Sequence, residues 1–122
     1  MKPTATVIDL PYPPSVNRLH GLRKGGRGKY LLPEVLAWRR DAGWLLKQQR
    51  PGKIPGPYRF KLLARRPDNR RRDADNLIKE TLDLCVSLGV VPDDSKAIID
   101  GAEFSEAIPD GCRVILTPVE GY

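Results

Sequence analysis

The sequence has few of the side chains that most often bind zinc or act as a general base. Its 122 residues include one histidine, His20, and two cysteines, Cys85 and Cys112. Zinc sites usually recruit Cys or His, and the chain has neither a Cys-x-x-Cys pair nor a histidine near a cysteine. A zinc centre and histidine-based catalysis are therefore disfavoured. Both cysteines lie in apolar patterns, which predicts two reduced, buried thiols; a disulfide between them is the alternative.

Long apolar runs are also missing. The N-terminal segment MKPTATVIDLPYPP has no signal-peptide core, and no segment approaches the length needed to cross a bilayer. Apolar residues make up 40% of the chain, which is typical of a globular protein. We therefore expect one domain over residues 1–122, in the cytoplasm.

Acidic residues are scarce in the first part of the chain. Residues 1–72 hold 18 Lys and Arg against 4 acids, a net charge of +14, whereas residues 73–122 hold 3 against 11, a net charge of −8. The sign changes within RRPDNRRRDADNLIKE, residues 65–80, where five arginines in eight positions directly precede Asp73 and Asp75. The basic part favours a polyanionic partner.

Hydrophobic periodicity predicts an α/β (α+β) domain with a small mixed sheet and two main helices packed on it. Strands are predicted by β-branched or alternating patterns at residues 4–10, 58–64, 97–104 and 112–119. The last two strands are expected to be joined like a hairpin through PDG at 109–111. Helical spacing predicts helices at 33–49 and from about 76 to 88, the second ended by Gly89. The glycine-rich segment 20–30 is predicted to be a mobile loop, either solvated or in contact with phosphates.

Asp73 and Asp75 lie two residues apart, so in an extended segment both carboxylates point to the same side. Two such carboxylates repel each other unless a cation lies beside them. Oxygen ligands favour Mg²⁺ or Mn²⁺. The alternative is a helix N-cap, which for the DxDN pattern alone is the favoured interpretation. In the same way, PDD at 92–94 is a common turn.

Lys79 and the later acids extend this pattern. Lys79 lies one helical turn after Asp75, where it would form an ordinary salt bridge or contact a phosphate; the sequence favours the salt bridge. The helix from Asn76 to Leu88 would span about 20 Å, and the extended chain from Gly89 to Asp94 returns at most about 17 Å. Therefore either the chain doubles back tightly, or Asp93 and Asp94 approach the paired aspartates of a second subunit.

Three ordered motifs, LPYPPSVNR (10–18), RRRDADNLIK (70–79) and PDDSK (92–96), resemble those of the RusA family of Holliday-junction resolvases. The resemblance spans nearly the whole chain. It implies a homodimer, often encoded in prophages, that depends on Mg²⁺, for which Mn²⁺ substitutes. It also implies paired nicking of opposed strands of a four-way DNA junction in recombination and repair.

The resemblance assigns roles to individual residues. It implies that Asp73, Asp75 and Asp94 are essential metal ligands, with Asp93 in support, and that Lys79 is needed for cleavage. It also implies a contribution from Arg72. The remaining candidate DNA contacts are basic residues of the arginine cluster, the N-terminal motif and the glycine-rich loop: Arg65, Arg66, Arg70, Arg71, Arg18, Lys24, Arg27 and Lys29.

Two other functions remain open from the residues alone. One is a non-catalytic basic module that binds nucleic acid and uses its aspartates as helix caps. The other is a nuclease that acts on other branched DNA or on RNA. A test for metal-dependent cleavage distinguishes the binding module from an enzyme. A comparison of cleavage rates on different substrates distinguishes the other nuclease from a junction resolvase.

Overall fold

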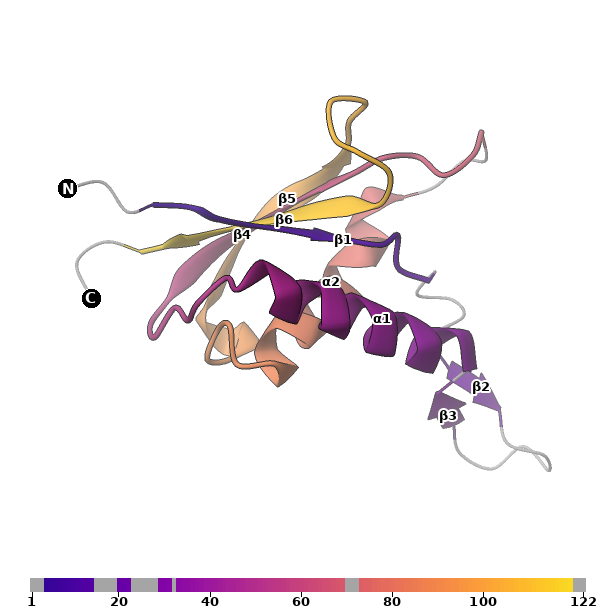
Figure 1. The fold of residues 1–122 in the computed structure, drawn as a ribbon, viewed down its shortest axis with the longest axis horizontal. Helices are drawn as coiled ribbons and strands as arrows, with labels where there is room; N and C mark the ends of the chain where they lie inside the picture. Colours follow the sequence, from indigo (N-terminus) through magenta and orange to yellow (C-terminus); the bar gives the residue numbers. More distant parts are fainter. Residues whose placement is uncertain (1–3, 15–19, 23–28, 32, 70–72, 120–122) are drawn as a thin grey trace.

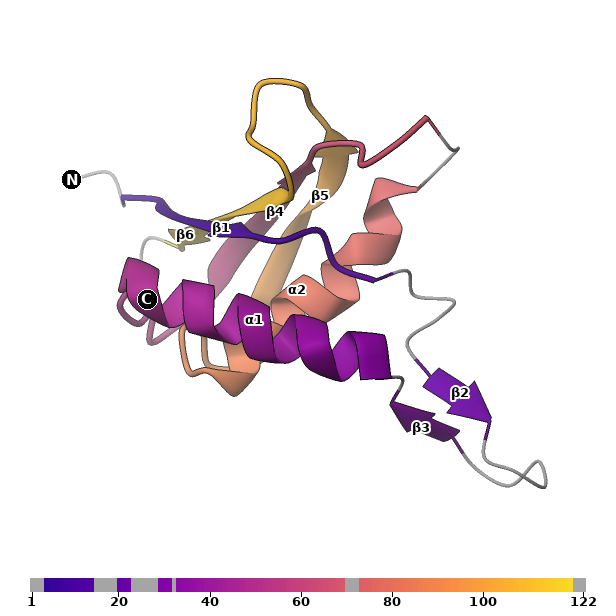
Figure 2. The ribbon, with the colours of Figure 1, turned by 45° about the vertical axis from the view of Figure 1, so that its right-hand side comes forward.

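The structure is a computed structural model that describes residues 4–14, 20–22, 29–31, 33–69 and 73–119. A four-stranded sheet is covered on one face by two helices, α1 (Pro33–Gln49) and α2 (Ile78–Ser87) (Figures 1 and 2). The sheet contains β1 (Thr6–Leu10), β4 (Tyr58–Ala64), β5 (Ala97–Phe104) and β6 (Cys112–Pro118). This arrangement confirms the predicted α+β fold with a small mixed sheet and two main helices.

The strand order is β1-β6-β4-β5, and β4 pairs in parallel with β5 while the other two pairings are antiparallel. The hairpin expected between β5 and β6 is therefore wrong, because β4 lies between them. All four inward residues of β4 are fully buried, whereas β5 is a largely exposed edge strand. Burying the more apolar strand in the centre outweighs the short connection between β5 and β6.

The core lies between the helices and the inner face of the sheet. Tyr58, Phe60, Leu62 and Ala64 alternate with outward residues along β4 and have no exposed surface, as the period-two pattern predicted. The outer face carries ion pairs instead, such as Arg59 with Asp100 at 2.7 Å. The sheet is thus apolar on one side and solvated on the other.

The two cysteines belong to this core. Cys85 on α2 and Cys112 on β6 are both buried and free. The prediction of two reduced, buried thiols is therefore confirmed. Burial raises the pKa of each thiol to about 12, so neither thiolate forms near neutral pH.

The segment predicted as a loop at 20–30 contains two short strands. β2 (His20–Leu22) and β3 (Lys29–Leu31) pair antiparallel and project beyond the start of α1 (Figure 2). Residues 23–28 between them lie outside the described residues. The expectation of a loop was wrong for the paired residues, because strands of three residues are too short to show a hydrophobic period.

The second helix begins differently from the prediction. A 3₁₀ turn, η2 (Ala74–Leu77), precedes α2, and Gly89 follows it with φ of 76°. The left-handed glycine expected at the helix end is confirmed. Of the helices in the described ranges, none has both the length and the apolarity that a membrane span requires.

Candidate active site

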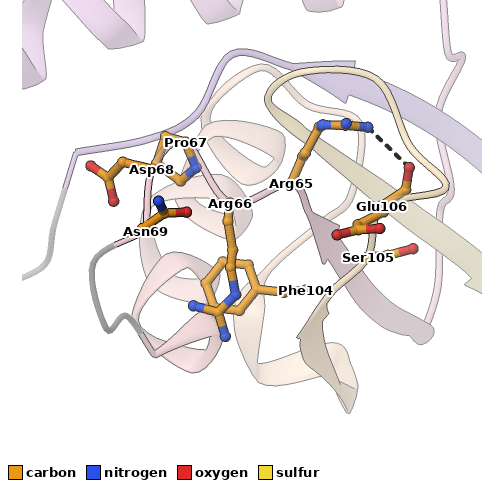
Figure 3. Close-up of a pocket in the computed structure, with 8 residues that line it drawn as sticks. All are labelled: Arg65, Arg66, Pro67, Asp68, Asn69, Phe104, Ser105 and Glu106. Atoms are coloured by element: carbon orange, nitrogen blue, oxygen red, sulfur yellow. Dashed lines mark hydrogen bonds between the residues drawn. The ribbon is translucent and has the colours of Figure 1, made fainter.

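The chain leaves the central strand β4 at Arg65 and Arg66, and the two side chains have different surroundings (Figure 3). Arg65 donates hydrogen bonds to the backbone carbonyls of Glu106 and Ile108, at 3.0 and 3.1 Å, and lies 3.6 Å from a carboxylate oxygen of Asp110. Its guanidinium therefore braces the β5–β6 connection. Arg66 lies instead over the ring of Phe104, 4.2 Å from its centroid.

Asp73 and Asp75 are exposed at the start of η2. Asp73 is the N-cap, because its Oδ1 accepts a 3.0 Å hydrogen bond from the backbone N–H of Asp75. The capping alternative is therefore confirmed for Asp73. A cap of this kind uses one carboxylate oxygen and holds the side chain in a fixed direction, so it is compatible with a metal ligand at the second oxygen.

Lys79 forms the salt bridge that the sequence favoured, but with a different partner. Its Nζ lies 3.4 Å from Asp83, one turn further along α2, rather than bridging back to Asp75. The Lys79 side chain is exposed and that of Asp83 is partly exposed, so the pair is weak and Lys79 is available to a phosphate at little cost. Lys79 lies in the first turn of α2, four residues after Asp75, as the sequence predicted.

Glu80 is a positioning residue that sequence reasoning missed. It is buried on α2 and forms a bidentate ion pair with Arg39 of α1, whose second contact measures 3.2 Å. Arg39 has a raised pKa, chiefly because of its hydrogen bond to Glu80. The pair fixes how α2 is rotated against α1, and so which way the neighbouring Lys79 points. The only signal in the sequence is a Glu among the apolar positions of the helix.

Asp93 and Asp94 lie on an exposed turn before β5, where Asp94 begins the 3₁₀ turn η3 (Asp94–Lys96). The buried Tyr58 anchors this turn by donating a 2.8 Å hydrogen bond to the carbonyl of Asp93. The pKa of Asp94 is raised, first by its hydrogen bond with Asp93 and then by the negative charges of Asp93 and Asp83. The same hydrogen bond, with those from Ser95, lowers the pKa of Asp93.

The two acidic pairs do not converge within one chain. Asp94 comes close enough to Asp83 for that charge to act on it, and Asp83 lies eight residues after Asp75, about 12 Å along a helix axis. Across the described residues, no three acidic, histidine or cysteine side chains are placed to hold one metal ion. The chain turns back onto α2 at η3, and the described acids still do not gather around Asp73 and Asp75 as a group of three.

Most of the other candidate DNA contacts lie outside the described residues. Arg18, Lys24, Arg27, Arg70, Arg71 and Arg72 lie outside the described residues, and Lys29 is placed only as a backbone position in β3. In the sequence, the arginines at 70–72 lie between Asn69 and the capping Asp73.

Comparison with known proteins identifies the family of this chain. A family model described as Endodeoxyribonuclease RusA matches residues 11–114, which include Asp73, Asp75, Lys79, Asp93 and Asp94. The chain belongs to the RusA family. The family resemblance drawn from the three sequence motifs is thereby confirmed.

Curated relatives in the RusA family come from phages and from bacteria. The crossover junction endodeoxyribonuclease rusA of Enterobacteria phage HK97 is 34% identical over 88 residues, which cover 71% of this chain and 72% of the relative. Those of Enterobacteria phage 82 and Escherichia coli K12 are each 30% identical over 114 residues, 93% of this chain and 92% of the relative. The similarity thus extends over almost the full length of both.

Proposed function

We propose that this protein is a metal-dependent endodeoxyribonuclease that resolves four-way DNA junctions by nicking opposed strands in recombination and repair. The observation that carries the proposal is the similarity to crossover junction endodeoxyribonucleases over 93% of the chain. The exposed aspartates and the neighbouring arginines supply the chemistry that such an activity needs. The proposed place of action is the cytoplasm, where bacterial and phage DNA is found.

Carboxylates are the candidate ligands, which fits Mg²⁺ and, as a substitute, Mn²⁺. Asp73, Asp75 and Asp94 would hold the ion, with Asp93 in support. A bound divalent ion supplies a Lewis acid that activates water and neutralises charge on a phosphate. The chain's own contribution is to aim the carboxylates: Asp73 is held by its cap to η2, and Asp93 by Tyr58 and Ser95.

Lys79 is proposed to stabilise the negative charge that develops on the phosphate during cleavage. Its ammonium group lies one turn beyond the paired aspartates, and its exposed contact with Asp83 is easily exchanged for a phosphate oxygen. The arginines at 70–72 and Arg66 would hold the DNA backbone beside the acids, contacts that position DNA without reading its sequence.

The separation of the acidic pairs supports a homodimer with shared sites. The partner subunit's Asp94 would complete the site that contains Asp73 and Asp75, because the described carboxylates of one chain do not gather into a group of three. Two such sites related by a two-fold axis would cut two strands, which matches the paired nicking proposed for a symmetric junction.

Asp75→Asn tests the proposed activity. The variant should lose cleavage of a synthetic four-way junction in Mg²⁺ by at least about 100-fold, while junction binding stays equal or tightens because a negative charge near phosphate is removed. Gel assays of cleavage with metal and of binding without metal separate these effects. Asp41→Asn, the same change on an exposed part of α1, is the matched control and should cleave normally.

The wild-type protein decides between the proposal and its alternatives. If it binds the junction but does not cleave in Mg²⁺ or Mn²⁺, the protein is a binding module and the enzyme proposal is wrong. If it cuts linear duplex, flaps or RNA as fast as the junction, it is a nuclease of another substrate class.

A further inference from the structure

The carboxyl ends of the parallel strands β4 and β5 meet at one edge of the sheet. Ala64 and Phe104 are partners in the register there, and the N–H of Ser105 donates to the carbonyl of Ala64 at 2.8 Å. Residues 65–69, which follow β4, and residues 104–106, which begin at the last residue of β5, line a cavity of about 580 Å³ (Figure 3). Open sheets commonly bind ligands beyond the carboxyl ends of parallel strands.

One wall of this cavity is formed by two stacked planar groups, the guanidinium of Arg66 and the ring of Phe104. The guanidinium carbon of Arg66 lies 4.2 Å from the centroid of the Phe104 ring. Phe104 is partly buried and packs against the core, whereas Arg66 is exposed. The ring is thus held in place by the fold, and the guanidinium lies on it as a second planar layer.

Arg66 has no competing structural role in the described part of the chain. No carboxylate there forms an ion pair with it, whereas the adjacent Arg65 is occupied by two carbonyls and by Asp110. In Figure 3 the two side chains extend in different directions, Arg65 toward the β5–β6 connection and Arg66 across Phe104. Arg66 therefore keeps its charge and its planar face for a ligand.

The cavity fits a nucleobase that carries its phosphate. Its volume is within the range of small-molecule sites, which is about 300–1,000 Å³. A planar base stacks on aromatic rings and on guanidinium planes, and the charge of Arg66 suits the adjoining phosphate. Asn69 and Ser105 place side-chain donors and acceptors on the lining, where the edge of a base would lie.

The cavity lies close to the paired aspartates. Asn69 precedes Asp73 by four residues, so the two are at most about 14 Å apart, and η2 packs against β5. Since successive nucleotides of a duplex strand rise by about 3.4 Å, a base in the cavity would lie within roughly four nucleotides of a phosphate at the aspartates. Where the arms of the junction are unstacked, a base next to the branch point lacks one stacking neighbour and costs less to move than a base inside a duplex.

We propose that Arg66 and Phe104 form a stacking platform for one base at the branch point of the DNA junction, which contributes to the choice of a junction over linear duplex. This inference rests on the proposed function for the identity of the substrate. The inference assigns a shared role to Arg66 and Phe104, which lie 38 positions apart in the sequence. The parallel pairing of β4 with β5 brings them together, so no sequence motif identifies them as a pair.

Two substitutions remove the platform in different ways. Phe104→Leu keeps an apolar side chain but has no ring, and Arg66→Lys keeps the charge but has no plane. Because Phe104 packs against the core, its variant is checked for folding by thermal denaturation; Arg66 is exposed, so Arg66→Lys tests the proposal even if Phe104→Leu fails to fold. Phe104→Tyr keeps the ring and should behave as wild type. Arg59→Lys, on the outer face of the sheet at the other end of β4, is the matched control.

Binding without metal is measured for a four-way junction and for linear duplex of the same sequence. Phe104→Leu and Arg66→Lys should each weaken junction binding by about tenfold and duplex binding by less than about twofold. Junctions with 2-aminopurine at single positions around the branch point report stacking directly. We expect the wild-type protein to change the fluorescence at one or two positions, and Phe104→Leu or Arg66→Lys to remove that change.

Equal loss of junction and duplex binding would reduce Arg66 to a phosphate contact and overturn the proposal. So would a fluorescence pattern that neither variant alters. The outcome is separate from that of the proposed cleavage, because no metal is present. A protein that stacks the base but never cuts would contradict the proposed function alone, and one that cuts without stacking would contradict this inference alone.

Discussion

At the scale of single residues, the candidate site combines structural and chemical roles in the same side chains. Asp73 caps η2 through one oxygen, and Asp94 shares a hydrogen bond with Asp93 and feels the negative charges of Asp93 and Asp83. Capping and metal binding were alternatives from the sequence, but a cap leaves a second oxygen and even helps to aim it. Adjacent carboxylates, in contrast, lower the stability of the metal-free fold.

Asp94→Asn should therefore stabilise the metal-free protein while it abolishes cleavage. The folded pKa of Asp94 lies above its ordinary value of 3.8, so the folded state favours the protonated form and loses stability as the pH rises through the folded pKa. The neutral amide avoids this loss and still offers a donor to Asp93. We expect a higher Tm than wild type at pH 7, and no difference below pH 3.8.

Thermal denaturation at the two pH values, in buffer with a chelator, measures this effect. Asp41→Asn is again the control, because it removes one exposed carboxylate from a pair with Arg40. A lower Tm for Asp94→Asn at pH 7 would show that the Asp94 carboxylate stabilises the fold, contrary to the direction of its pKa shift.

At the scale of elements, α2 determines where every candidate catalytic group lies. The paired aspartates lie at η2 directly before it, Lys79 lies in its first turn, and η3, which begins at Asp94, contacts it. The helix is held by its apolar face and by the ion pair between Glu80 and Arg39 of α1. A buried charge that depends on a single partner makes the orientation of α2 sensitive to α1.

Arg39→Ala should destabilise the protein by about 3 kcal/mol, because it leaves the carboxylate of Glu80 buried without a partner. Urea denaturation of the metal-free protein measures the change. The neighbouring Arg40→Ala removes an ion pair whose side chains are 76% and 62% exposed, and it should cost less than about 0.5 kcal/mol. Similar unfolding midpoints for the two variants would mean that the Arg39–Glu80 pair does not hold α2 in place.

At the scale of the whole molecule, the proposed active site requires two chains. One chain brings Asp73, Asp75 and Lys79 to one end of α2, and among the described residues Asp94 does not join the paired aspartates in a group of three carboxylates that could hold one metal ion. Carboxylate ligands of one divalent ion lie within about 2–3 Å of it. In the proposed homodimer, a second copy would supply the missing carboxylate, and activity would then depend on dimerisation.

Mixed dimers of Asp75→Asn and Asp94→Asn test this arrangement. If the sites are shared, one site of the mixed dimer contains both substitutions and the other contains neither, so junction nicking on one strand should return. If each chain builds its own site, every site carries one substitution and the mixed dimer stays inactive. Co-expression with two different affinity tags isolates the mixed dimer, and each pure variant provides the inactive baseline.

Much of the fold could be predicted because it is encoded locally. The alternation from Tyr58 to Ala64 and the helical spacing of residues 33–49 each report which side of an element is buried. Gly89 identified the end of α2 by its backbone freedom, and the three ordered motifs identified the family. The short strands β2 and β3 were missed because three residues carry no period.

The sequence by itself determined the main helices and the strands of the large sheet, the buried thiols and the residues with metal-binding chemistry, because composition and period depend only on neighbours along the chain. The tertiary structure decided what depends on distant partners. It inserted β4 between β5 and β6, separated Asp94 from Asp73 and Asp75, and gave Arg65 to the backbone but Arg66 to Phe104. Pairing between strands and the reach of a turn are set by packing across the core, and no local pattern records them.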